Sequence, residues 1–165
     1  MSRFGNSAKT QFLDGFLETS IYASHDDLAA RCKFNFSYFD VQPAGQDFEE
    51  WDHGQLKKLL NKLKDYSRES LSHWRAQPVG AAGTVLAIYG AFPTAKSDFK
   101  APQHVPKEAQ WGRFRLESAV RLVGFVLPSE CSGVVHPVTK QKFDCNTFYV
   151  AFLDANHKFY KTEKK

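Results

Sequence analysis

The sequence predicts an α+β domain with helices packed on one face of a mostly antiparallel sheet of four to five strands. Helical periodicity is concentrated before residue 75, whereas apolar, strand-like runs dominate the chain after residue 83. The segments between those later runs are rich in glycine and proline. Strands that follow one another without intervening helices favour an antiparallel meander.

Composition predicts a single folded domain over residues 1–165, with a helical arm at 1–32 and an α+β core at 33–160. Hydrophobic residues make up 42% of the chain, which is too apolar for a disordered sequence. No run approaches the roughly 18 apolar residues of a membrane helix, and the first residues lack the apolar stretch of a signal peptide. The chain has only 3 cysteines, which argues against a disulfide framework. We expect a cytoplasmic protein that does not contact membranes.

The N-terminal arm shows apolar residues at spacings of three and four, from Phe12 through Phe16 to Ile21. A second short helix is expected from Ser24, where Asp27 follows a candidate N-cap. The apolar stripe must be buried, either on its own domain or across a homodimer interface.

Strands and a central helix are expected after the arm. The segment KFNFSYFD alternates strictly, with Phe34, Phe36 and Tyr38 on one face. Leucines between Phe48 and Trp74 trace one helical face, which predicts one long helix or two that are broken near Tyr66 and Ser67. The predicted strands cover residues 33–39, 84–89, 111–117, 121–127 and 146–154.

Three loops are expected between these elements. QPVGAAG is too rich in glycine for a strand, and residues 91–110 contain three prolines. A loop as long as 91–110 often has a binding or lid function, although it can equally be structural padding. Residues 128–145 form the third connection.

If Ser118 and Ala119 form the turn of the hairpin in WGRFRLESAVRL, Phe114 pairs with Val123 and Arg115 pairs with Leu122.

Charge is distributed unevenly along the chain. Residues 1–110 contain 13 Lys and Arg against 13 Asp and Glu, whereas residues 111–165 contain 9 against 5. This excess favours an anionic partner for the C-terminal part, although the last lysines could equally form a solvated tail.

The C-terminal third contains a set of side chains suited to RNA. Arginine forks bind phosphate, and a histidine or tyrosine can move the protons when a 2′-hydroxyl attacks the adjacent phosphodiester. This chemistry needs no metal and no cofactor. The candidate catalytic residues are His157, Tyr160 and Arg121. The candidate nucleic-acid-binding residues are Arg113, Arg115, Lys158 and Lys161. The alternative is structural: Arg113 would pair with Glu117, and His157 would only close a turn.

The same segments resemble the RelE-type superfamily of bacterial toxin mRNA interferases. KFNFSYFD, the helical stretch 48–74, GRFRLESAVRLVGFVL and FYVAFLDANHKFY follow the order of elements in that family. The resemblance spans residues 33–160. It implies that the three arginines contact phosphate, that His157 or Tyr160 transfers protons, and that an antitoxin protein and RNA on ribosomes are partners. The arm and the loops 91–110 and 128–145 depart from the shorter typical members.

Two other patterns point elsewhere. Arg68 and His73 have the spacing that resembles the catalytic motif of HEPN ribonucleases, which are all-helical dimers. Four residues offer zinc-type ligands, but no two of them are closely paired in the sequence: Cys131, His136, Cys145 and His157. No GxGxxG or phosphate-loop motif is present, so nucleotide-binding α/β folds are not supported.

The sequence therefore predicts a metal-independent endoribonuclease that could serve as the toxin of a toxin–antitoxin pair. The alternative is a non-catalytic module of phage or host-defence type that binds nucleic acid or protein through the same arginine face.

Overall fold

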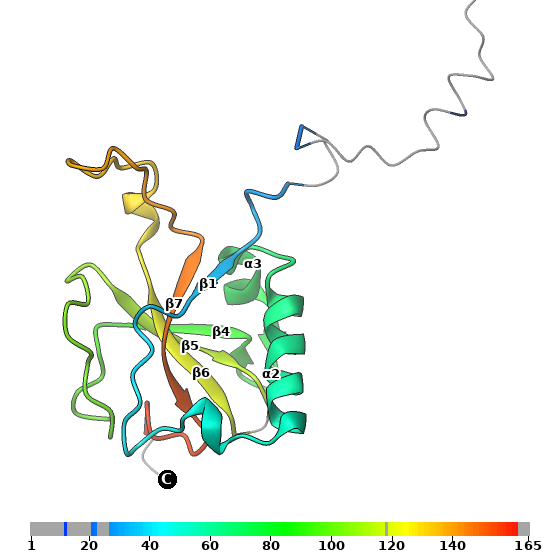
Figure 1. Ribbon diagram of the computed structural model, residues 1–165, viewed down its shortest axis with the longest axis vertical. Coiled ribbons are helices and arrows are strands. Elements are labelled where there is room, and N and C mark those ends of the chain that lie inside the picture. Colours follow the sequence, from blue (N-terminus) through cyan, green and yellow to red (C-terminus); the bar gives the residue numbers. More distant parts are fainter. Residues whose placement is uncertain (1–11, 13–20, 23–26, 118, 162–165) are drawn as a thin grey trace, which may run out of the picture.

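A computed structural model describes residues 12, 21–22, 27–117 and 119–161. It contains a five-stranded sheet in the order β1-β7-β6-β5-β4, with two helices against one face (Figure 1). The strands of this sheet are β1 (Lys33–Asn35), β4 (Leu86–Gly90), β5 (Gln110–Arg115), β6 (Arg121–Val126) and β7 (Thr147–Asp154). The two helices on this sheet are α2 (His53–Tyr66) and α3 (Leu71–Ala76), and 3-10 turns lie at η1 (Phe48–Glu50) and η2 (Ser129–Cys131).

Strands β4 to β7 form the expected antiparallel meander, in which each strand pairs with the next. The predicted positions of these four strands are confirmed to within two residues. All six residues of β6 are buried because this strand lies in the middle of the sheet and both of its faces are covered. The α+β class is confirmed, and the sheet is mixed because β1 runs parallel to β7.

The first strand is shorter than expected. β1 ends at Asn35, whose side chain accepts a hydrogen bond from the backbone N–H of Ser37 at 2.9 Å and turns the chain. The expectation that Phe34 and Tyr38 share one face is therefore wrong. Phe34 packs on Phe114, whereas Tyr38 packs on Phe125 in the cluster on the opposite face.

The central helical stretch is two helices that are separated at Ser67. Asp52 caps α2 by accepting the N–H of Gln55 at 2.8 Å, and Ser70 caps α3 in the same way through His73. Arg68 lies in the turn between the helices and His73 on α3, so the two residues of the HEPN-like spacing are not on one helix.

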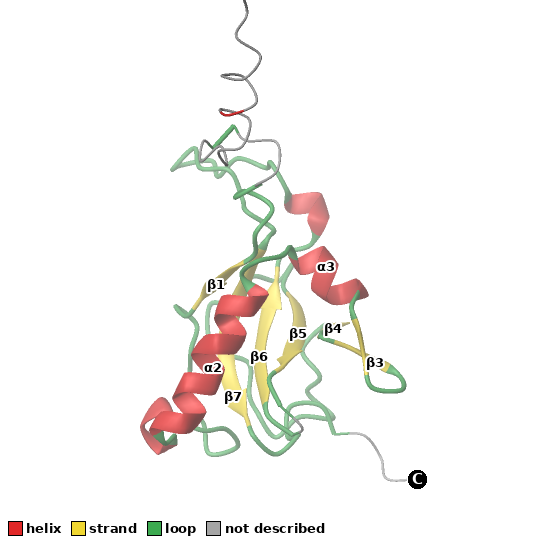
Figure 2. Cartoon of the chain, turned by 90° about the vertical axis from the view of Figure 1, so that its right-hand side faces the viewer, coloured by secondary structure: helices red, strands yellow, loops and turns green. Residues whose placement is uncertain are grey.

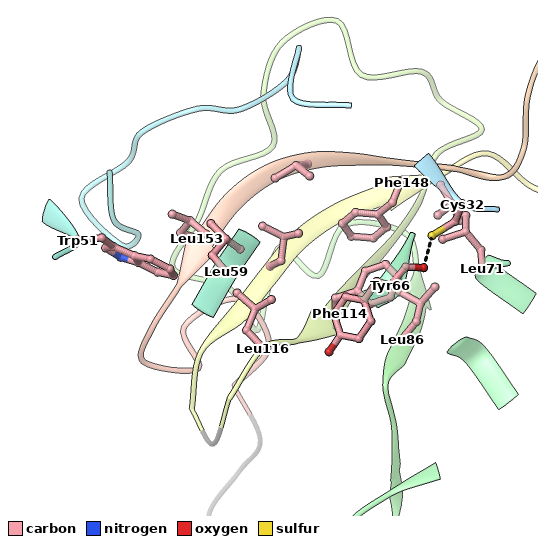
Figure 3. Close-up of a cluster of buried hydrophobic side chains, with 13 residues drawn as sticks. Cys32, Trp51, Leu59, Tyr66, Leu71, Leu86, Phe114, Leu116, Phe148 and Leu153 are labelled. Atoms are coloured by element: carbon pink, nitrogen blue, oxygen red, sulfur yellow. Dashed lines mark hydrogen bonds between the residues drawn. The ribbon is translucent and has the colours of Figure 1, made fainter. Parts of the chain in front are cut away.

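The core on the helical side joins α2 and α3 to the sheet (Figure 3). Tyr66 stacks on Phe114 of β5 at 4.8 Å between ring centroids, and its hydroxyl donates to the carbonyl of Arg115. The backbone carbonyl of Tyr66 accepts from Cys32 Sγ and from the indole N–H of Trp74. This tyrosine therefore anchors the end of α2 to β5 and to the segment before β1.

The loop 91–110 covers the other face of the sheet. Its Phe99 is 3% exposed and stacks on Phe152 of β7 at 4.6 Å, and its Phe92 packs edge-on against Trp111 of β5. Phe159 from the C-terminal segment fills the same cluster. The length of this loop thus has a structural reason, because it buries the sheet face that no helix covers.

Replacing Phe99 with alanine is expected to lower the free energy of unfolding by about 3 kcal/mol, because a buried phenylalanine leaves a cavity in a close-packed cluster. Urea denaturation would measure the effect. Phe143→Ala is the matched control, since Phe143 is 38% exposed and should cost less than about 1 kcal/mol. Equal losses in the two variants would mean that the loop is not part of the core.

The segment QPVGAAG is a two-stranded hairpin rather than a plain loop. β2 (Pro78–Val79) pairs with β3 (Gly83–Thr84), and Gly80 adopts a positive φ of 67° at the turn. Strands of two residues are too short to show alternation, which is why periodicity did not indicate them. Figure 2 shows β3 beside β4, on the edge of the domain away from β1.

The hairpin between β5 and β6 differs in register from the prediction. Arg115 pairs with Arg121 and Phe114 pairs with Leu122, one residue away from the expected partners. The N–H of Leu116 bonds to the carbonyl of Val120, so the connection is longer than a two-residue turn. Because side chains alternate along a strand, this register places Arg113, Arg115 and Arg121 on the same face of the sheet.

Most of the N-terminal arm lies outside the described residues, including Phe16 and the candidate cap at Ser24. Residues 28–30 form a turn, which Asp27 closes by accepting the N–H groups of Ala29 and Ala30, so the second short helix does not extend through them. Among the described helices, none is long and apolar enough to cross a membrane.

Candidate active site

A depression of about 680 Å³ lies on the sheet face opposite the helices, between the ends of four adjacent strands and the C-terminal segment. Its lining residues are Tyr89, Arg113, Arg121, Asp154, His157, Tyr160 and Lys161. Strands β4, β5, β6 and β7 each contribute one of the first four. We call this depression the cationic pocket.

Asp154 shapes the turn that carries His157. Its carboxylate is 1% exposed and accepts three backbone N–H groups, those of Asn156, Lys158 and Phe159, at 2.9–3.0 Å. His157 lies inside this turn with a positive φ of 56°, a conformation that only a tightly bonded turn makes favourable for a non-glycine residue. Phe159, two residues further along, is fully buried in the core and anchors the end of the turn, whereas the side chain of His157 is exposed.

Arg121 is a buried cation at the base of the pocket, with 3% of its surface exposed. Its Nη1 donates to the backbone carbonyls of Glu117 and Val120 at 2.7 and 2.9 Å, which fixes the guanidinium. Burial, together with Arg113 and Arg115, lowers the pKa of Arg121 to about 10. The group is therefore still charged at neutral pH.

His157 faces this guanidinium, with 3.5 Å between its Nε2 and Nη2 of Arg121. Partial burial and the positive charge of Arg121 lower the pKa of His157 below its ordinary value of 6.5. The imidazole is therefore mainly neutral at pH 7. Because arginine can only donate, a hydrogen bond at this contact has Nε2 as the unprotonated, accepting nitrogen. Its length makes it weak, so the lone pair of Nε2 can still accept a proton from a substrate.

An aromatic pair forms one wall of the pocket. The rings of Tyr89 and Tyr160 stack with centroids 4.3 Å apart and an interplanar angle of 8°. The hydroxyl of Tyr89 accepts a hydrogen bond from Nε of Arg113 at 2.6 Å, and Nζ of Lys96 lies 5.2 Å from the centre of the Tyr160 ring. Tyr89 therefore holds Arg113 in place, and Lys96 places a second cation beside Tyr160.

The structure brings together most of the residues that the sequence singled out. Arg113, Arg121, His157, Tyr160 and Lys161 all line the cationic pocket. Lys161 also pairs with Asp98.

Two of the expected residues are not in the pocket. Arg115 lines a separate depression next to Trp74. Lys158 is not among the lining residues; its backbone carbonyl accepts the N–H of Asp98. The structural alternative, in which Arg113 pairs with Glu117, is also wrong. Glu117 pairs with Lys58 instead, at 3.2 Å.

Sequence reasoning missed Tyr89 and Asp154. Tyr89 belongs to the predicted strand 84–89, which the meander placed beside the next strand, but nothing in its own segment marked this side chain as a partner of Arg113. Asp154 carried a usable signal, because an aspartate at the end of a strand and before a turn often accepts backbone N–H groups.

Metal-binding residues are not clustered in the described part of the chain. No three His, Cys, Asp or Glu side chains there are grouped closely enough to hold an ion, and the four residues considered for zinc do not converge. Comparison of the chain with protein-family models, with curated proteins and with solved structures gave no significant match.

Proposed function

We propose that the protein is a metal-independent endoribonuclease of RelE type that cleaves RNA at the cationic pocket. One observation carries the proposal: a histidine with a lowered pKa faces a buried arginine in a pocket that also contains a second arginine and a tyrosine. A neutral base beside fixed cations is the arrangement that phosphodiester transesterification requires, because the base removes a proton while negative charge develops on the phosphate.

In the proposed reaction, Nε2 of His157 takes the proton of a ribose 2′-hydroxyl. The 2′-oxygen attacks the adjacent phosphorus, and the bond from phosphorus to the 5′-oxygen of the next nucleotide breaks. Arg113 and Arg121 stabilise the charge on the non-bridging oxygens through their N–H groups. The leaving oxygen takes a proton from the hydroxyl of Tyr160. The products are a 2′,3′-cyclic phosphate and a 5′-hydroxyl, and DNA is not cut because it lacks the nucleophile.

A toxin role extends this proposal. RNA cleavage in the cytoplasm would arrest growth, so the protein would need a partner that blocks the cationic pocket until the activity is required. An acidic antitoxin segment would match the charge of Arg113 and Lys161.

A non-catalytic module that binds nucleic acid is the second candidate. The stacked pair of Tyr89 and Tyr160 next to Arg113 favours it, because aromatic faces and arginine hold bases and phosphates without any proton transfer. The two candidates differ in a single outcome. A non-catalytic module would bind RNA, and the RNA would be recovered intact.

The pH dependence of cleavage follows from the neutral base. Below the pKa of His157 the imidazole is protonated and cannot accept the 2′-hydroxyl proton, so kcat/KM should fall about tenfold per pH unit on the acid side. Since the pKa lies below 6.5, this fall should be confined to pH values below 6.5. A pH–rate profile of a fluorescent RNA oligonucleotide would measure it. A rate that rises as the pH falls through this region would contradict a neutral histidine base.

A further inference from the structure

A second depression of about 440 Å³ adjoins the cationic pocket and shares Tyr89 and Arg113 with it. Its other lining residues belong to Ala87 and the β2–β3 hairpin, Pro78 and Gly80 to Thr84. We propose that this depression, which we call the hairpin groove, binds the single-stranded RNA that flanks the scissile phosphate. The inference rests on the proposed function, since it assigns the path of that substrate.

The hairpin groove has a floor without long side chains. Gly80, Ala81, Ala82 and Gly83 follow one another at the exposed tip of the hairpin. Such residues allow close approach of a nucleotide backbone, and they provide no side-chain donors or acceptors to read base edges. The groove is therefore suited to a strand of any sequence.

Cations are spaced along this path. Arg113 and Arg115 lie on the same face of β5, two residues and about 6.8 Å apart along the strand. Nη1 of Arg115 lies 3.6 Å from the position a β-carbon would take at Gly80, so this guanidinium reaches the hairpin. The spacing is comparable to that of successive phosphates in an extended single strand.

The path continues beyond the hairpin. Arg115 lines a third depression, of about 700 Å³, which shares Pro78 with the hairpin groove. This depression contains Lys62 and Trp74, and also the carboxylates of Asp65 and Glu117. Three adjoining depressions thus place an aromatic ring beside an arginine at two points, Tyr89 beside Arg113 and Trp74 in the depression of Arg115. Bases can stack on such rings only when they are unpaired, so the arrangement favours a single strand over a duplex.

Charge substitution at Ala82 tests the path without touching the cationic pocket. Ala82→Glu and Ala82→Lys place side chains of similar length and opposite charge at the same exposed position. We expect Ala82→Glu to weaken binding of a 2′-O-methyl oligouridine dodecamer about tenfold, and Ala82→Lys to leave it equal or tighter. Fluorescence anisotropy of the labelled dodecamer provides the measurement.

Salt dependence provides a second readout. Arg115→Ala should weaken dodecamer binding about tenfold, and it should reduce the slope of log affinity against log salt by about 1, because one phosphate contact is lost. Lys107→Ala is the matched control, since Lys107 is 91% exposed outside the three depressions and should change neither quantity.

The outcomes separate this inference from the proposed function. If the wild type cuts RNA but Ala82→Glu and Arg115→Ala bind the dodecamer as the wild type does, the path is wrong and the endoribonuclease stands. If the dodecamer binds with the expected sensitivity to both substitutions but no RNA is cut, the path stands and the catalytic proposal fails. Preference for a duplex of the same length over the dodecamer would also overturn the path.

Discussion

Replacing His157 with asparagine is expected to slow RNA cleavage by about 10²- to 10⁴-fold, the contribution of one positioned general base. Asparagine tolerates the left-handed backbone conformation at this position, so the turn should keep its shape while the base is lost. Affinity for RNA should remain nearly unchanged, because Arg113 and Arg121 still hold the phosphate. Single-turnover cleavage and anisotropy on the same oligonucleotide measure the two effects separately.

His136→Asn is the matched control for this variant. His136 lies in the connection 128–145, where its Nδ1 accepts the backbone N–H groups of Val138 and Thr139. It does not line the cationic pocket, so its loss should leave the cleavage rate within about twofold of the wild type. Equal rates for His157→Asn and the wild type would exclude His157 as the base.

Replacing Asp154 with alanine is expected to lower the free energy of unfolding by about 3–5 kcal/mol. The substitution leaves three backbone N–H groups without their acceptor, one of them on the buried Phe159, and each such loss costs about 1–3 kcal/mol. Cleavage should fall as well, because the turn that presents His157 depends on the same bonds. Urea denaturation followed by tryptophan fluorescence measures the stability.

Asp154→Asn is the informative companion to this change. Its amide oxygen can still accept two of the three bonds that the carboxylate made, so we expect it to lose roughly half as much stability as Asp154→Ala. If Asp154→Ala is as stable as the wild type, the turn is held by the packing of Phe159 alone.

Local pattern was sufficient to predict most elements of the domain. The leucine face of α2 and the apolar runs of β4 to β7 depend only on neighbouring residues, and the four strands were located within two residues of their observed bounds. The class of side chains in the pocket was also predictable, because arginines on a strand and a histidine in a turn are visible in the sequence. Five of the seven proposed site residues meet in one depression.

The features that the sequence did not predict depend on long-range pairing. The parallel placement of β1 beside β7 joins residues more than 100 positions apart, and no local period records it. The one-residue error in the register of β5 and β6 arose from assuming the shortest turn, yet this register decides whether Arg121 shares a face with Arg113. Tyr89 became part of the site through its hydrogen bond with Arg113 across the two strands, and no local pattern records that contact.

The most direct test of the account is to incubate the purified protein with single-stranded RNA in EDTA and to determine the chemistry of the product ends by mass spectrometry. The account predicts cleavage that persists in EDTA, with 2′,3′-cyclic phosphate and 5′-hydroxyl ends, and no cleavage of the matching DNA. Intact RNA under all conditions, cleavage that EDTA abolishes, or 5′-phosphate ends would contradict it.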